Sequence, residues 1–419
     1  MTTPPLLIHN ARLATPVAST TGVPNWQLTE IFPAALYCEN GHIVRAGKEQ
    51  EVLAGLPACE QLDARQQLMT PGLVDCHTHP VFFNLRAHEF VQRVQGKTYK
   101  EIAAAGGGIR YSVRDLRQAN EQALLQRVLQ RLDNFLQYGT TTLEAKSGYG
   151  LSLEHELKSL EILQQAGSQH PLEIVPTFLG AHEVPDEFRE RREDYIKLVI
   201  NEMIPAVALQ GLARFADVFC EEHVFKAEES KRILRAAKAA GLQPKIHADQ
   251  LTASGGAEVA IAVGAVSADH LENTPPALFE NLRRTAVVPV LLPGADFFIR
   301  ATKYADARAM IAAGLPVAIS TDFNPGTCMT ENLPMMMTLA CLHLRLTPAE
   351  ALVAATLHAA QALAMGNQIG SLEVGKQADA VIWNAAAVEE ISYHFAVNLV
   401  HRVIKKGRLV CSRDQTNIH

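Results

Sequence analysis

The sequence predicts a (β/α)8 TIM barrel with a small composite β-sandwich domain. Three observations support this prediction. Eight short apolar runs alternate with helix-length segments over about 260 residues, the size of one such barrel. Polar side chains suited to metal chemistry follow these runs, and strand-like segments with turn signals flank them at both ends of the chain. Barrel strands are covered on both faces, so they are expected to be apolar throughout.

The flanking segments define the expected domains. Residues 1–66 contain short strand patterns with an Asn-Gly hairpin signal, and strand patterns return at 370–385 and 401–412. Chain termini tend to meet, so we expect 1–66 and 370–419 to form the composite β-sandwich domain. The barrel domain is then expected over 67–369.

The barrel elements follow in order. Helical patterns separate the strands, such as 119–139 and 228–242, which both close on a glycine, as helix C-termini often do. A helical pair is expected at 347–366. The expected strands are 72–79, 140–150, 173–184, 216–225, 243–250, 265–272, 286–295 and 316–326.

Composition and charge exclude several function classes. Of the 419 residues, 48% are hydrophobic and 20% charged, which fits a soluble globular protein. The net charge of -6 gives no electrostatic case for nucleic acid or an anionic membrane as partner. We expect no secretory signal and no bilayer-spanning segment. The seven cysteines are scattered without any CxxC, which indicates reduced thiols and a cytoplasmic protein.

Polar residues gather at the carboxyl ends of the predicted strands, the rim where TIM barrels build active sites. A single histidine there could be an ordinary core residue with one hydrogen bond. Five histidines and an aspartate on one rim indicate a shared site. The rim residues are His77, His79, Tyr149, His182, His247, His270 and Asp322.

Four of these residues form a candidate metal site. Residues i and i+2 of a strand face the same side, so His77 and His79 can bind one ion. His247 and Asp322 would add a nitrogen and an oxygen, a set that suits either zinc or iron with a position open for water. Such a metal lowers the pKa of water toward about 7 and polarises a carbonyl. Asp322 could carry the proton to a leaving nitrogen. The pattern therefore indicates hydrolysis.

Several motifs resemble known families. PGLVDCHTHP, HADQ, SADHLE and STDFNPG resemble the amidohydrolase superfamily. RAHEF, AAAGGGI, EAKSGYGL, TFLGAH, HADQL and TDFNPGT more narrowly resemble the imidazolonepropionase family, in the expected order over nearly the whole chain. The resemblance implies hydrolysis of the cyclic amide of 4-imidazolone-5-propanoate to N-formimidoyl-L-glutamate, in histidine degradation. It also implies a homodimer.

Carried over to this chain, the resemblance implies the same metal ligands and assigns further roles. Catalysis is expected from Asp322, His270 and His182, with the division of protons among them left open. Arg86 offers a bidentate fork for the propionate carboxylate. The implied substrate contacts are Arg86, Tyr149, His182, Gln250, Asn324, Gly326 and Thr327.

Two departures and one absence refine these expectations. Deaminase-like relatives carry a proton-shuttling glutamate where this chain has Gln250, which cannot accept a proton, so we expect Gln250 to orient a ring nitrogen. The approach to the arginine, Phe82–Leu85, is bulkier than the family's glycine-rich one. The fourth predicted strand lacks the lysine that bridges two metals in binuclear members, so we expect a single metal ion. Lys146 lies on the second predicted strand, where we expect it to be structural or a charge partner.

Two alternatives stay open at this point. The chain could be an aminohydrolase of another small heterocycle, although Gln250 counts against a deaminase and Arg86 favours an anionic substrate. It could also be a catalytically silent scaffold, but such relatives typically lose metal ligands, and all four are present here.

Overall fold

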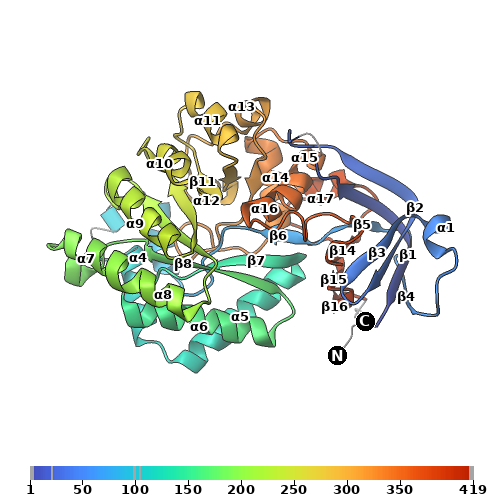
Figure 1. The fold of residues 1–419 in the computed structure, drawn as a ribbon, viewed down its shortest axis with the longest axis horizontal. Coiled ribbons are helices and arrows are strands. Elements are labelled where there is room, and N and C mark those ends of the chain that lie inside the picture. The colour runs from blue at the N-terminus through green and yellow to red at the C-terminus, as the bar shows by residue number, and fades with distance from the viewer. Residues whose placement is uncertain (1–3, 20–21, 98–100, 103–104, 415–419) are drawn as a thin grey trace.

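Two sheets organise the molecule, a parallel barrel and a separate sheet beside it (Figure 1). The computed structural model describes the chain except for residues 1–3, 20–21, 98–100, 103–104 and 415–419. The first two alanines of the AAAGGGI motif therefore lie outside the described residues.

The barrel contains eight parallel strands that pair in chain order. Its first and last strands meet just beyond their ends, where the backbone N–H of Asp322 donates to the carbonyl of His77 (3.1 Å) and that of His79 to Phe323 (2.8 Å). Seven of the eight predicted segments contain one barrel strand each, and the eighth, 216–225, overlaps β9, which begins one residue earlier, so the predicted fold is confirmed. The strands are β6 (Leu73–Asp75), β7 (Thr140–Lys146), β8 (Glu173–Ala181), β9 (Phe215–Cys220), β10 (Gln243–Ala248), β11 (Ser267–His270), β12 (Val288–Leu291) and β13 (Ala318–Ile319).

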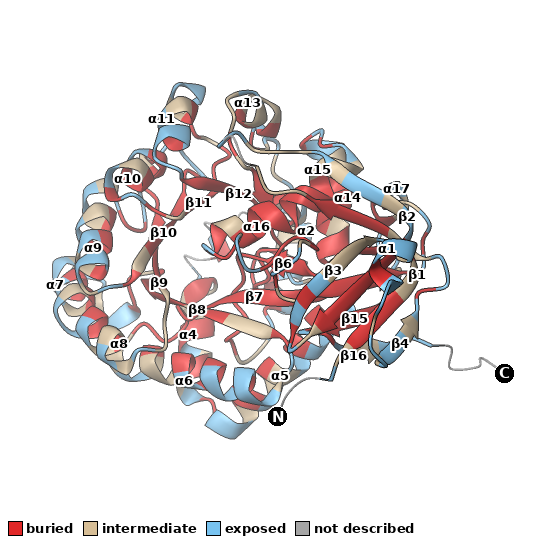
Figure 2. Cartoon of the chain, turned by 45° about the vertical axis from the view of Figure 1, so that its right-hand side comes forward, coloured by how far each residue is buried: buried red, intermediate tan, exposed pale blue. Residues whose placement is uncertain are grey.

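Helices wrap the barrel with buried inner and exposed outer faces (Figure 2). The helix expected at 119–139 is capped at its N-terminus by Asn120, whose side chain accepts from the N–H of Ala123. It ends before Gly139, which has φ 87°. The helical pair expected at 347–366 is α15 and α16. The α-helices of the described chain are α1 (Glu49–Leu53), α2 (Ala87–Val94), α4 (Ile109–Gln118), α5 (Glu121–Gln137), α6 (Leu153–Gln169), α7 (Arg192–Leu198), α8 (Ile204–Gln210), α9 (Ala227–Ala239), α10 (Gly256–Val263), α11 (Phe279–Arg284), α12 (Pro293–Ile299), α13 (Ala307–Ala312), α14 (Leu333–His343), α15 (Pro348–Ala354), α16 (Leu357–Ala362) and α17 (Val388–Tyr393).

The second sheet joins both ends of the chain, as the composite domain requires. Its strand order is β16-β15-β14-β5-β1-β2-β3, with β4 paired to β1. Strand β5 lies between β1 and β14, so segments from the two chain ends share one hydrogen-bonded sheet. The predicted domain break after residue 66 stays a prediction. The strands are β1 (Leu6–Pro16), β2 (Leu28–Glu39), β3 (His42–Lys48), β4 (Glu60–Asp63), β5 (Leu68–Pro71), β14 (Ala380–Trp383), β15 (Val400–Lys405) and β16 (Arg408–Ser412).

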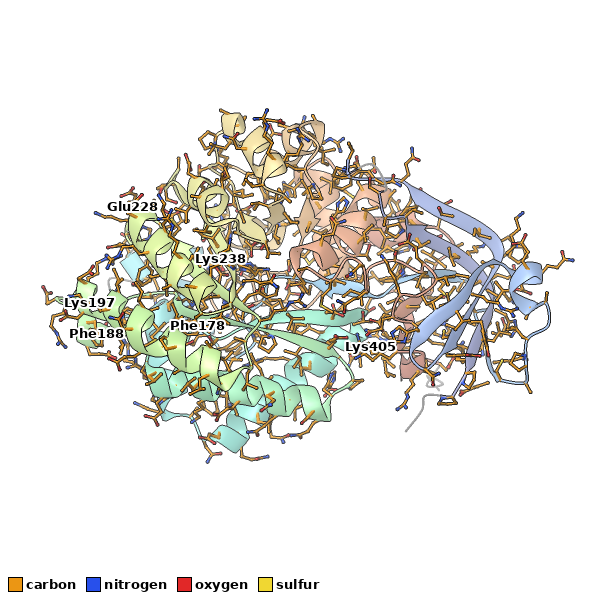
Figure 3. All side chains as sticks on the ribbon, viewed as in Figure 1. Phe178, Phe188, Lys197, Glu228, Lys238 and Lys405 are labelled. Atoms are coloured by element: carbon orange, nitrogen blue, oxygen red, sulfur yellow. The ribbon has the colours of Figure 1, made fainter. Side chains whose placement is uncertain are left out.

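A buried ion cluster ties the second sheet to the barrel. Lys405 at the end of β15 lies 2.8 Å from Asp379 Oδ2 and 3.1 Å from Glu173 Oε2 at the start of β8 (Figure 3). The Lys405 side chain is only 2% exposed. Burial would raise the pKa of Glu173, but the charge of Lys405 outweighs it and lowers this pKa to about 2. The cluster is therefore charged and fixes the two sheets against each other.

Two expectations from composition can be compared with the fold. Among the described residues, no helix combines the length and apolarity needed to cross a bilayer. All seven cysteines are free thiols, as their spacing predicts.

Candidate active site and metal centre

A pocket of about 820 Å³ opens at the carboxyl ends of the barrel strands. It brings together most of the predicted site residues, although they come from segments far apart in the chain. His77, fully buried, contacts His79 of the wall. The predicted residues that line the pocket are His79, Arg86, Tyr149, His182, His247, Gln250, His270, Asp322, Asn324 and Thr327.

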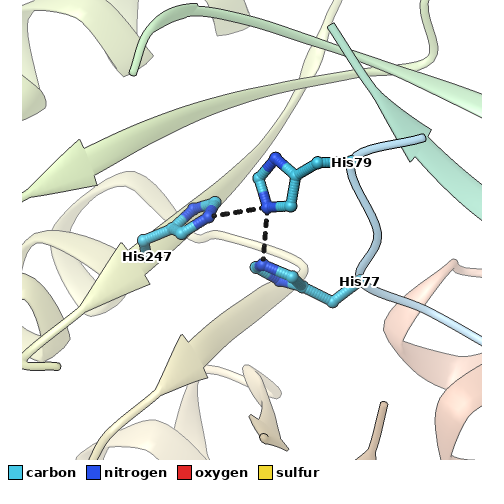
Figure 4. A group of neighbouring side chains, drawn as sticks. All are labelled: His77, His79 and His247. Atoms are coloured by element: carbon cyan, nitrogen blue, oxygen red, sulfur yellow. Dashed lines mark hydrogen bonds between the residues drawn. The ribbon is translucent and has the colours of Figure 1, made fainter. Parts of the chain in front are cut away.

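Three of the four predicted metal ligands, His77, His79 and His247, form one close group, and the fourth, Asp322, groups with His77 and His270. The Nε2 atom of His79 lies 3.3 Å from Nε2 of His77 and 3.4 Å from Nε2 of His247 (Figure 4). Asp322 Oδ1 lies 3.5 Å from Nε2 of His79 and 3.6 Å from Nε2 of His77. All four side chains are buried.

Carboxylates behind two of the histidines explain why these nitrogens face one another. Asp269 Oδ2 lies 2.5 Å from Nδ1 of His77, and Asp217 Oδ2 lies 3.0 Å from Nδ1 of His247. Carboxylates hold the proton on Nδ1, so the Nε2 lone pairs point at each other. Burial, aided by the nearby Lys146 charge, lowers the pKa of His77 well below its usual value, so the ring is neutral. Converging lone pairs in a buried site repel unless a cation lies between them, so this donor set fits a metal ion.

Lys146 belongs to this supporting layer. Its Nζ lies 2.7 Å from Asp217 Oδ2 and 2.8 Å from Glu144 Oε1, and all three side chains are fully buried. Burial opposes the charge, but Asp217 and Glu144 raise the pKa of Lys146 above its usual value. The ammonium therefore acts as a charge partner of the carboxylates behind the histidines.

His182 is fixed in one tautomer. Its Nδ1 lies 2.9 Å from the carbonyl oxygen of Gly148, which can only accept, so Nδ1 carries the proton. Burial lowers the pKa of His182 well below its usual value, so the ring is neutral. The ring stacks on His79 with centroids 5.2 Å apart. Its Nε2 is therefore a hydrogen-bond acceptor, suited to a ligand N–H rather than to a carbonyl oxygen.

Glu156 shapes the turn that carries Gly148 and Tyr149. Its carboxylate accepts backbone N–H groups from Gly148 (3.0 Å), Gly150 (2.9 Å) and Leu151 (2.8 Å). Gly148 has φ 102°, which favours glycine. The turn places the Tyr149 ring in the pocket wall, 5.3 Å from the His182 ring.

Arg86 lines the pocket and is a candidate to bind an anionic group. The residue is 4% exposed, and its Nε and Nη1 make no hydrogen bond to the described residues, although Nε lies 3.5 Å from Glu89 Oε2 in an ion pair. Phe82 is fully buried under the guanidinium of Arg131, which lies 3.5 Å from the ring centroid, and packs against Phe323. Buried donors without hydrogen-bond partners are costly, so these two nitrogens suit an anionic group.

Asn324 organises the turn after Asp322. Its Oδ1 accepts from the N–H of Gly326 (2.8 Å) and of Thr327 (2.7 Å), and its Nδ2 donates to the carbonyl of Asp322 (2.7 Å). Thr327 Oγ1 donates to Asp322 Oδ2 at 3.3 Å. Gly326 does not line the pocket, and its N–H is already used. The predicted substrate contacts of this turn stay predictions.

His270 is backed by two carboxyl groups. Its Nδ1 lies 3.7 Å from Glu272 Oε1, and His270 and Leu271 have φ 80° and 70°, which strains the backbone. Burial raises the pKa of Glu272 to about 8 and that of Asp296 to about 9. The nearby Glu272 raises the pKa of Asp296 further, whereas a hydrogen bond with Asp296 lowers that of Glu272. This pair is therefore mostly protonated near pH 7.

The carboxylates behind the predicted metal ligands were not predicted from the sequence. The sequence did carry a signal for these residues, because a carboxylate within an otherwise apolar strand must find a buried partner. The carboxylates of this kind are Asp217, Asp269 and Glu144. Their partners, however, lie on other strands and only the fold brings them together.

Comparison with known proteins places the chain in a family. The amidohydrolase family model matches residues 68–410. The chain is 48% identical to the imidazolonepropionase of Geobacillus kaustophilus, over 99% of this chain and 100% of that protein. It is 49% identical to that of Symbiobacterium thermophilum, over 90% of this chain and 89% of that protein.

Solved structures share the fold at low sequence identity. E. coli guanine deaminase superposes with a TM-score of 0.77 at 16% identity, covering 98% of this chain and 99% of that one. A 5-methylcytosine deaminase from Klebsiella pneumoniae gives 0.73 at 16% identity, covering 99% and 100%. These likenesses concern the fold alone. The family-model match and the full-length relatives show that the chain belongs to the amidohydrolase family and, within it, to the imidazolonepropionases.

Proposed function

We propose that the chain hydrolyses the cyclic amide of 4-imidazolone-5-propanoate to N-formimidoyl-L-glutamate. One observation carries the proposal: a buried arginine with two donors that make no hydrogen bond lies in the same pocket as a close group of three histidines with Asp322 beside it. The arginine suits the propionate carboxylate, and the histidine cluster suits a hydrolytic metal. The relatives at 44–49% identity support this substrate.

The proposed cofactor is one metal ion, zinc or iron, held by His77, His79, His247 and Asp322. Bound there, it would activate a water and polarise the ring carbonyl. Asp217 and Asp269 keep the Nε2 atoms of His247 and His77 available as donors.

Asp322 is the proposed proton carrier. Burial would raise its pKa, but the contact with His79 and the other histidines around it lower this pKa below its usual value. It is therefore a carboxylate that can accept the proton of the attacking water. It then delivers that proton to the ring nitrogen as the carbon–nitrogen bond breaks and the carbonyl carbon becomes a carboxylate.

The other pocket residues orient the substrate. Arg86 binds the propionate, and His182 accepts a ring N–H at its Nε2. His270 is proposed to face the ring carbonyl. Gln250 is proposed to orient a ring nitrogen, and Tyr149, Asn324 and Thr327 to complete the pocket around the side-chain end of the substrate. Gly326, which does not line the pocket, is proposed to act there only through the position of Arg86.

Absorbance-monitored turnover of freshly made 4-imidazolone-5-propanoate tests the proposal, with the product identified by mass. Rapid loss of substrate with formation of N-formimidoyl-L-glutamate is expected. No turnover by metal-loaded protein, together with ammonia release from guanine or cytosine, would instead favour the aminohydrolase alternative.

We also propose that the enzyme works as a homodimer in the cytoplasm. The seven free thiols support a reducing compartment. The dimer rests on the family resemblance alone, and light scattering of the purified protein tests it.

A further inference from the structure

The guanidinium of Arg86 is confined from two sides. Glu89, one turn further along α2 and 4% exposed, places Oε2 at 3.5 Å from Nε. On another side lies Gly326, where an added Cβ would overlap the guanidinium. Arg86 therefore occupies the volume that any side chain at position 326 would take.

Glu89 is itself fixed by the glycine-rich run. Its Oε1 accepts the backbone N–H of Gly108 at 2.9 Å, and an added Cβ at Gly107 would lie 2.9 Å from the same oxygen. One carboxylate thus joins α2, the glycine run and Arg86. This explains why a buried glutamate and adjacent glycines accompany the arginine, a pattern that the proposed mechanism leaves unused.

We propose that Glu89 and Gly326 are specificity-determining positioning residues that hold Arg86 in the one orientation in which it binds a single substrate carboxylate. The inference rests on the proposed function and names the residues that set its preference for an anionic substrate. Neither residue touches the reacting carbon–nitrogen bond; each acts through Arg86. Fixing a long side chain before binding reduces the entropy lost when the carboxylate arrives.

Two substitutions disturb Arg86 by different means. Glu89→Gln keeps the size of the side chain. The NH2 group of the glutamine amide can only donate, so it must face another donor, the N–H of either Gly108 or Arg86. Gly326→Ala adds one methyl group where the guanidinium lies. Gly326 is not among the glycines with positive φ, so alanine adds no backbone strain there. The matched control is Gly167→Ala on α6, where an added Cβ makes only ordinary contacts with Ile174, from 3.7 Å.

The experiment compares two substrates across these proteins in the metal-loaded state. One is 4-imidazolone-5-propanoate, and the other is the same ring with an ethyl group in place of the propionate. Both variants are expected to raise KM for the propanoate at least tenfold with kcat changed less than threefold. On the ethyl analogue, kcat/KM of each variant is expected to stay within threefold of the parent protein. The control is expected to match the parent on both substrates.

The outcomes separate the inference from the proposed function. Equal losses on both substrates would show a general structural role and overturn the inference, as would unchanged KM for the propanoate. If Glu89→Gln fails to fold by circular dichroism, Gly326→Ala decides alone. A parent protein that does not hydrolyse the propanoate would overturn the proposed function itself.

Discussion

At the residue scale, the chemistry of the site depends on which nitrogen or oxygen of each side chain is not already used in a hydrogen bond within the protein. Spacing along a strand predicted that His77 and His79 face one ion, because the two-residue period needs no knowledge of the fold. The tautomer of His182 could not be predicted, since its partner is a backbone carbonyl 34 residues away. Asp322 adopts φ 52°, an uncommon conformation for a non-glycine residue, held by the Asn324 amide.

Asp322→Asn is expected to lower kcat by about 10²- to 10⁴-fold, because an amide cannot accept the proton and binds metal more weakly. Turnover of 4-imidazolone-5-propanoate and metal content per chain are the measurements. Asp133→Asn, an exposed carboxylate on α5, is the control and should match the parent. Activity of Asp322→Asn within threefold of the parent would argue against the proton role.

His182→Asn separates the two nitrogens of this ring. The asparagine amide can still donate to the Gly148 carbonyl but offers no acceptor at the position of Nε2. We expect kcat/KM to fall about tenfold, because the loss of one net hydrogen bond costs about 1.4 kcal/mol. Steady-state kinetics measure it, and an unchanged kcat/KM would show that Nε2 does not contact the substrate.

At the element scale, strands and helices were predictable because their signals are local: apolar runs, glycine stops and capping residues. The tendency of chain ends to meet predicted a shared sheet, but not the pairing of β5 with β14, because the predicted boundary after residue 66 assigned residues 68–71 to the barrel. The cluster of Lys405, Asp379 and Glu173 was not predictable, because its members lie on three separate strands or turns and only packing brings them together.

Lys405→Met is expected to destabilise the protein by about 3 kcal/mol at pH 7, because it removes the buried cation beside Asp379 and leaves Glu173 only the more exposed Lys406, at 3.4 Å. Pairing depresses the pKa of Glu173 to about 2 in the folded state, below its unfolded value of 4.5. Its contribution is therefore complete above about pH 4.5 and is lost as the pH falls toward 2. Urea unfolding should show the largest difference between variant and parent at pH 7 and a smaller one at pH 3.5. Lys406→Met, whose side chain is 53% exposed, should change stability by less than about 1 kcal/mol.

At the scale of the whole molecule, the rim of the barrel brings residues from most of the chain into one pocket. The sequence pattern was sufficient for the eight-stranded barrel and for bringing His77, His79 and His247 together. It did not predict the supporting residues behind these histidines, because the contacts of Asp217, Asp269 and Lys146 depend on strand register. The buried carboxylates of Asp217 and Asp269 are what suit this group of histidines to a metal ion.

One metal ion in this pocket is proposed to enable hydrolysis of the imidazolone ring. The most direct test removes metal with a chelator, returns zinc or iron in steps, and records turnover of 4-imidazolone-5-propanoate against metal bound per chain. We expect negligible turnover by the metal-free protein and activity that rises linearly to a plateau at one ion per chain. Full turnover by metal-free protein, or a plateau at two ions, would contradict the proposal.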